Sequence, residues 1–113
     1  MISGAYVMIF TQDEAADRVF MRDVLELPFV GDGEHWLTFR LPTTELGVHG
    51  HDRNDFHQIY FICDDLDATM EKLADKGVTC SEPESASWGR STSVTLPGGG
   101  RIGVYEAHHA RAV

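Results

Sequence analysis

The sequence predicts an α+β fold in one domain, residues 1–113, made of two repeated β-α-β-β-β modules at about 1–50 and 56–107. The segment Tyr6–Asp13 aligns without a gap with His57–Asp64, and both segments end in an aspartate that precedes a helical pattern. Leu-Pro and Gly-Val pairs then recur in the same order in both halves. Because four matches in one order are hard to obtain by chance, they indicate an internal duplication around one core.

Each half is expected to contain a strand, one helix and three further short strands. The first helix has its apolar face at Ala16–Val24 and ends before Pro28, and the second has its apolar face at Leu66–Ala74 and ends at Gly77. The expected strands lie near residues 3–11, 28–31, 35–41, 44–49, 56–63, 78–81, 90–96 and 101–106.

Charge and apolar patterning exclude several classes of partner. The formal net charge of −9 repels nucleic acid and anionic membrane surfaces. No apolar run approaches the roughly 18 residues of a membrane span, and the N-terminus lacks a secretion signal. We therefore expect a cytoplasmic protein, with Cys63 and Cys80 as reduced thiols. Cys63 ends the strand predicted near residues 56–63 and lies next to two acids, a setting that disfavours the thiolate, so we expect a structural role for it.

The repeat resembles the vicinal oxygen chelate superfamily, which includes glyoxalase I, extradiol dioxygenases, fosfomycin-resistance enzymes and bleomycin-resistance proteins. The segments that carry the resemblance are His57–Asp67 with its following helix, and Leu96–Tyr105. The resemblance implies two modules whose curved sheets enclose a cleft, with the helices outside. It also implies a homodimer, which agrees with the small size of the domain.

The resemblance places the four metal-ligand positions of that superfamily at Tyr6, Gly47, His57 and Gly103. Only His57 is an ordinary metal ligand, because glycine has no donor and neutral tyrosine is a poor one. The closer analogue is therefore the metal-free branch. We expect a glyoxalase/bleomycin-resistance-like protein that binds or sequesters a small molecule in its cleft and uses no cofactor.

A second hypothesis keeps a divalent metal and enzymatic activity. His49, His51 and His57 lie close in sequence, and a site built from His49 and His57 with Glu106 as a weaker donor predicts a metal-dependent lyase, isomerase or dioxygenase. In a third hypothesis, His57 and Tyr6 act as general acid-base groups without metal. The sequence alone leaves open whether the protein is an enzyme.

Strand alternation predicts which residues would line the cleft. If His57 faces the cleft, every second residue of its strand also faces the cleft. The same alternation applies to the strands that contain the other three ligand positions. Trp88, in a serine-rich loop, is a candidate for stacking on a planar ligand. The predicted ligand-binding residues are Tyr6, Met8, Phe10, His49, His57, Ile59, Phe61, Trp88, Arg101 and Tyr105.

Overall fold

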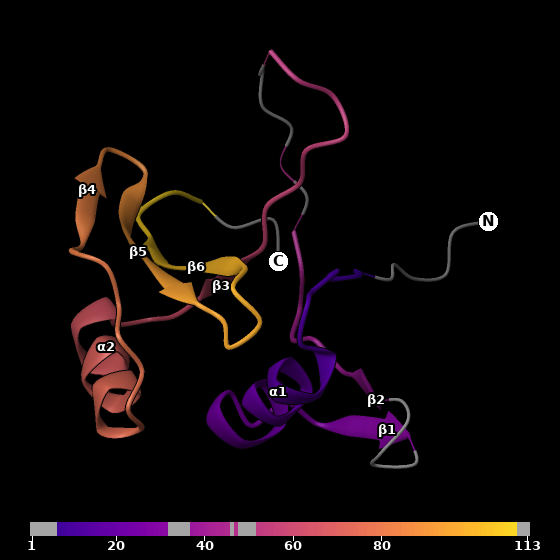
Figure 1. Cartoon of the computed structure of the whole chain (residues 1–113). Helices are drawn as coiled ribbons and strands as arrows, with labels where there is room; N and C mark the ends of the chain where they lie inside the picture. The colour runs from indigo at the N-terminus through magenta and orange to yellow at the C-terminus, as the bar shows by residue number, and fades with distance from the viewer. Residues whose placement is uncertain (1–6, 32–36, 46, 48–51, 111–113) are drawn as a thin grey trace.

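The structure is a computed structural model that describes residues 7–31, 37–45, 47 and 52–110 (Figure 1). Its helical segments are α1 (Glu14–Val19), which continues as the π-helical η1 (Phe20–Val24), and α2 (Leu66–Asp75). Its strands are β1 (Phe29–Gly31), β2 (Leu37–Phe39), β3 (Tyr60–Ile62), β4 (Glu84–Ala86), β5 (Gly89–Thr95) and β6 (Arg101–Ala107).

The second half of the chain forms a four-stranded sheet with the order β3-β6-β5-β4. Strand β3 runs parallel to β6, whereas β4, β5 and β6 pair antiparallel. The parallel pairing needs a long connection, and α2 lies within it. This half therefore follows the predicted order of one strand, one helix and three strands.

The described part of the first half contains α1, η1 and a separate antiparallel pair, β1 and β2. In Figure 1 these elements lie below the four-stranded sheet, and α1 is close to the connection between β5 and β6. The end of the predicted first module falls largely on residues outside the described ranges, so the boundary between the modules stays a prediction.

The core lies between α2 and one face of the four-stranded sheet. Leu66 and Leu73 of α2 are buried with Val94, Ile102 and Val104 of β5 and β6. Phe20 and Met21 of η1 join the same cluster. Because both halves contribute side chains, they share one hydrophobic core, as expected for a chain of this length.

The helix ends follow the predicted signals with one shift. Asp13 and Asp65 accept the backbone N–H of the third residue after them, at 3.1 and 3.0 Å. The acid that caps the second helix is therefore Asp65, one residue later than the aligned Asp64. Gly77 ends this helix with φ +79°, a conformation that favours glycine.

Four of the expected strands need correction. Described residues 7–11 form no strand, and neither do the described residues of 44–49. The strand expected at 56–63 is confined to β3, and the one expected at 78–81 is reduced to a single bridge between Cys80 and Val94. Strand β4 was missed because Pro83 and the polar residues around it have low strand propensity. Periodicity shows which residues suit a strand, but only a hydrogen-bonding partner makes them one.

A buried carboxylate joins the two halves. Asp17 of α1 is 6% exposed, and its Oδ1 accepts a hydrogen bond of 2.7 Å from the backbone N–H of Gly98, in the turn between β5 and β6. Its Oδ2 has no hydrogen-bond partner. At the C-terminal end of η1, Lys76 Nζ donates a hydrogen bond to the carbonyl of Val24 at 3.0 Å. These contacts connect the β5–β6 turn and the end of α2 to the helical segment of the first half.

Among the described residues there is no helix of the length and apolar character that a bilayer crossing requires.

Candidate ligand-binding face

The strand register divides the four-stranded sheet into two faces with different chemistry. Paired residues point to the same side, so the face packed against α2 contains Val94, Ile102 and Val104. The alternate residues form the other face, which we call the open face. The open face consists of Tyr60, Ile62, Ser91, Ser93, Thr95, Arg101, Gly103 and Tyr105.

Aromatic rings gather on the open face around Tyr105. The ring of Tyr60 meets it edge to face at a centroid distance of 5.7 Å, and Trp88 does so at 5.8 Å. The ring of His109 stacks on Tyr105 at 6.1 Å. Tyr60 and Trp88 remain 46% and 45% exposed, so their apolar surfaces are available to a ligand.

The space at Gly103 is filled by Tyr60. The two residues are partners in the parallel pairing of β3 and β6, and a Cβ placed at Gly103 would overlap the Tyr60 ring. The Tyr60 hydroxyl donates to Gln58 Oε1 at 3.0 Å, which holds the ring in this position. The glycine at this predicted ligand position therefore gives room to an aromatic ring.

Two predicted cleft residues lie on the opposite face. Ile59 and Phe61 pack against the core, and Phe61 pairs with the buried Val104. The prediction that they share a face with Arg101 and Tyr105 is therefore wrong. The error is one residue of register, and in a strand such a shift moves every side chain to the other side of the sheet.

The same shift explains why the sequence did not predict Tyr60 and Gln58 as ligand-binding residues. The two helices are capped by Asp13 and Asp65, whereas the sequence alignment of the two halves pairs Asp13 with Asp64, one residue earlier. An alignment on the caps would have placed Gln58 and Tyr60 on the open face. The signal was present in the sequence, in the choice between the adjacent acids Asp64 and Asp65.

Glu106 lies on the helix side of the sheet, opposite Arg90 in the neighbouring strand. Its Oε1 accepts from the backbone N–H of Leu66 at 3.0 Å, and its Oε2 is 2.7 Å from His108 Nε2. The hydrogen bond with His108, followed by that with Leu66, holds the pKa of Glu106 below its ordinary value. Glu106 therefore fastens the start of α2 to β6 and points away from the open face.

A second polar contact fastens the same helix. Arg90 binds both carboxylate oxygens of Asp67 at 3.1 and 3.2 Å, and this hydrogen bonding lowers the pKa of Asp67. Nearby, burial raises the pKa of the Cys63 thiol, whose sulfur lies 3.6 Å from the carbonyl of Tyr105. Cys63 and Cys80 are both free, and the raised pKa of Cys63 agrees with a structural role.

The remaining predicted residues lie apart or outside the described ranges. Met8 and Phe10 are 59% and 91% exposed on the segment before α1, and His57 is exposed ahead of β3. Tyr6 and His49 lie outside the described residues. The structure thus groups three of the predicted residues, Trp88, Arg101 and Tyr105, on or beside the open face.

The described ligand positions do not fit a divalent cation. Among the described positions only His57 carries an ordinary metal ligand, because Gly47 and Gly103 offer no side-chain donor and the Tyr60 ring covers Gly103. Within the described ranges, no three His, Cys, Asp or Glu side chains are grouped so that they could hold a metal ion. Hard divalent cations require several oxygen or imidazole donors, and this face of the sheet presents mainly aromatic rings and hydroxyls.

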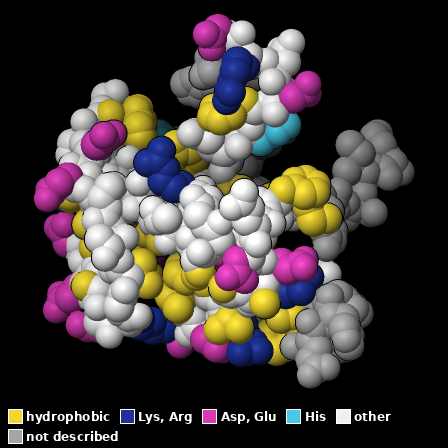
Figure 2. Space-filling model, viewed as in Figure 1, with side chains coloured by type: hydrophobic (Ala, Val, Ile, Leu, Met, Phe, Trp, Pro, Cys, Tyr) yellow, Lys and Arg dark blue, Asp and Glu magenta, His cyan; other side chains and the backbone are white. Residues whose placement is uncertain are grey.

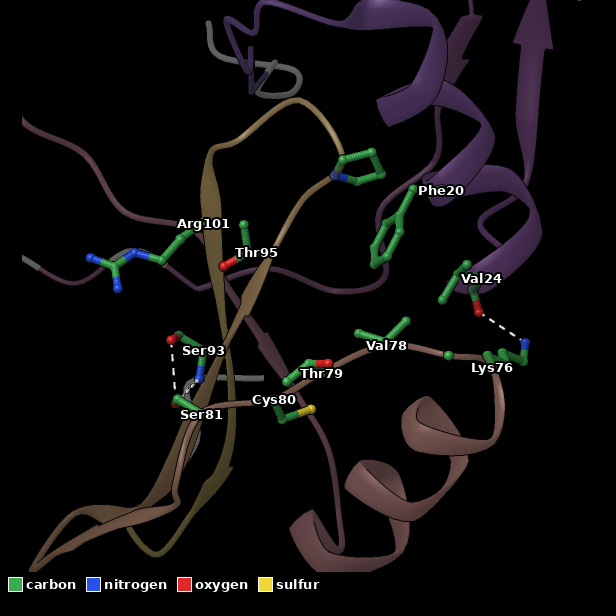
Figure 3. A pocket seen from close by; sticks show the side chains of 12 residues that line it. Phe20, Val24, Lys76, Val78, Thr79, Cys80, Ser81, Ser93, Thr95 and Arg101 are labelled. Atoms are coloured by element: carbon green, nitrogen blue, oxygen red, sulfur yellow. Dashed lines mark hydrogen bonds between the residues drawn. The ribbon is translucent and has the colours of Figure 1, made fainter.

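A groove of about 610 Å³ begins at the end of the open face. Ser93, Thr95 and Arg101 form its polar side. Figure 3 shows Phe20 and Val24 projecting towards Val78 on its apolar side, whereas Arg101 extends away from them. The groove therefore connects the sheet with the helix of the first half.

Neither protein-family models nor curated proteins match the sequence. Solved structures do match. TnmS3, an antibiotic binding protein from Streptomyces sp. CB03234, is 21% identical with a TM-score of 0.66, over 95% of this chain and 99% of that chain. Lactoylglutathione lyase from Agrobacterium tumefaciens is 15% identical with a TM-score of 0.66, over 92% of each chain. A glyoxalase/bleomycin resistance protein/dioxygenase superfamily member from Sphaerobacter thermophilus DSM 20745 is 24% identical with a TM-score of 0.57, over 90% of this chain and 93% of that chain.

The chain has the vicinal oxygen chelate fold. This confirms the fold class predicted from the internal repeat. The vicinal oxygen chelate fold carries proteins described as binders and as lyases, so the fold alone does not assign a reaction.

Proposed function

We propose that this protein binds a small organic molecule on the open face, without a metal ion, in the manner of a binding or sequestration protein. The observation that carries the proposal is the Tyr60 ring lying over Gly103. At this position an aromatic ring occupies the place of a cation ligand. The Tyr60 ring contacts Tyr105, which in turn contacts Trp88. Ligand sites commonly combine such apolar surface with a few polar groups.

The similarity to TnmS3 supports this proposal, since that protein is an antibiotic binding protein with the same fold. Two observations disfavour the enzymatic alternative with a metal at His49, His57 and Glu106. Glycines occupy the ligand positions 47 and 103, and Glu106 points away from the open face. Glu106 is held by Leu66 and His108 on the helix side, so a ligand role would require both contacts to break. Its release would leave the backbone N–H of Leu66, the first residue of α2, without this partner.

We also propose that the protein works as a cytoplasmic homodimer. Val7, Met8 and Phe10 expose 48%, 59% and 91% of their surface in a segment that forms no strand. Clustered exposed apolar residues favour association. Sedimentation velocity on the wild type and on Phe10→Ser tests this part, with a dimer in the wild type and a shift towards monomer in the variant as the expected result. A monomer in the wild type at micromolar concentration contradicts it.

A thermal-shift screen of small aromatic compounds tests ligand binding, followed by calorimetric titration of those that stabilise the protein. We expect binding to be lost in Trp88→Ala and retained in Phe29→Ala. Phe29 is a matched control because it is also 45% exposed but lies on the separate β1–β2 sheet. Equal loss in both variants would refute a site on the open face.

Metal analysis tests the competing hypothesis. The protein is purified without chelator, supplied with Mn²⁺, Fe²⁺, Ni²⁺ and Zn²⁺, and its bound metal is measured by mass spectrometry. We expect less than stoichiometric metal, unchanged in His57→Ala. A stoichiometric metal that disappears in His57→Ala would overturn the proposal in favour of the metal-dependent enzyme.

A further inference from the structure

The open face carries a positively charged side chain beside its aromatic rings. Arg101 begins β6 and is exposed. It shares a face with Gly103, so it lies about 7 Å along the strand from the ring of Tyr60 that covers that glycine. Arg101 also lines the groove at the end of this face. A planar group resting on Tyr60 would therefore lie beside the guanidinium.

The guanidinium of Arg101 has no acidic partner within the part of the chain that the structure describes. By contrast, Arg18, Arg22 and Arg90 each form an ion pair with a nearby carboxylate. An arginine head group offers five N–H donors in a fixed planar arrangement that matches a carboxylate or a phosphate. Arg101 is thus an available anion-binding group next to an aromatic surface.

Several acidic residues of this protein lie on α2, on the side of the sheet opposite to the open face. Figure 2 shows Asp and Glu side chains over much of the visible surface, including the lower left, where α2 covers the other face of the sheet. On the side of the open face, Glu84 in β4 is the nearest strand carboxylate, opposite Ser91. The spacing of strands and residues puts Glu84 about 12 Å from Gly103, the residue that the Tyr60 ring covers, against about 7 Å for Arg101. Among the charged strand residues on the open face, Arg101 therefore lies nearer to Gly103 and its covering Tyr60 ring than Glu84 does.

We infer that the ligand of the open face is a planar aromatic molecule with an anionic group, such as a carboxylate, that pairs with Arg101. The inference rests on the proposed function and adds the chemical class of the ligand. Tyr60 supplies the apolar surface beside Arg101, Tyr105 and Trp88 extend that surface away from it, and Arg101 selects the charge. Arg101 is accordingly a specificity-determining residue.

Three probes of equal shape test the charge preference: 2-naphthoate, its neutral amide and its cationic amidine. Each is titrated by calorimetry into the wild type, Arg101→Gln and Arg101→Lys. In the wild type, we expect naphthoate to bind roughly tenfold more tightly than the amide, as for a hydrogen bond to a charged group, and the amidine to bind most weakly. Arg101→Gln should lower the affinity for naphthoate to about that for the amide, whereas Arg101→Lys should keep part of the difference between the two probes.

Arg40→Gln is the matched control, since Arg40 is exposed but lies after β2, outside the open face. Its titrations should equal those of the wild type. Binding of all three probes without preference for naphthoate, or a preference that persists in Arg101→Gln, overturns the anion inference and leaves the aromatic site intact. Failure of all three probes to bind overturns the aromatic site itself.

Discussion

Replacing Gly103 by alanine tests the packing of Tyr60 on which the proposed site depends. A Cβ at this position overlaps the Tyr60 ring, whose Cγ would lie 3.0 Å away. Strand β6 is paired on both sides, so its backbone cannot move aside easily. The ring must therefore swing towards solvent, which breaks its contact with Tyr105 and its hydrogen bond to Gln58.

The magnitude follows from the exposed fraction of Tyr60. At 46% exposure, about half of the side chain is in contact with the protein. Losing that burial costs about 1–1.5 kcal/mol, and losing the edge-to-face pair costs about 0.5–1.5 kcal/mol. The lower unfolded-state entropy of alanine returns about 0.4–1 kcal/mol. The expected net loss is about 1–2 kcal/mol, which for 113 residues lowers Tm by about 4–8 °C.

Urea unfolding of a double-mutant cycle measures this coupling. Gly103→Ala should destabilise the wild type but change the stability of Tyr60→Ala by less than about 0.5 kcal/mol, because the overlapping ring is gone. Gly100→Ala is the control: a Cβ there meets nothing within 4 Å, so its effect should be small in both backgrounds. A neutral Gly103→Ala, or equal destabilisation with and without Tyr60, would refute the packing argument.

Four further substitutions or conditions probe the same framework. Asp17→Ala should cost about 1–3 kcal/mol by leaving the N–H of Gly98 unpaired, and Asp17→Asn less; equal unfolding midpoints for both variants would contradict this. Gly89→Ala should cost about 2–4 kcal/mol, since φ is +153° and its Cβ meets a backbone carbonyl; unchanged thermal unfolding would be inconsistent with it. The pKa of Glu106 is lowered, so its stabilisation is complete above the ordinary value of 4.5 and is lost as pH falls through the folded-state pKa. The stability difference between wild type and Glu106→Gln should therefore shrink in acid, and a difference that grows there would count against the contact. Burial raises the pKa of Cys63, so its alkylation at pH 8 should be slower than that of free cysteine, and a fast reaction would argue against burial.

The sequence by itself determined the fold class and the positions of both helices. The repeated segments, the aspartate caps and Gly77 are local signals, and the structure has helices beginning one residue after Asp13 and Asp65. Local signals suffice for such features because a helix satisfies its backbone hydrogen bonds within its own segment. The same reasoning located β5 and β6 to within one residue.

Only the tertiary structure decided which side of each strand faces the core. Ile59 and Tyr60 are adjacent and both apolar enough to be buried, and the sequence does not say which of them α2 covers. The register between β3 and β6 settles it, by placing the ring of Tyr60 over Gly103. Pairing between distant strands is a non-local property, so a one-residue difference that is small in the sequence exchanges the core face and the open face of the sheet.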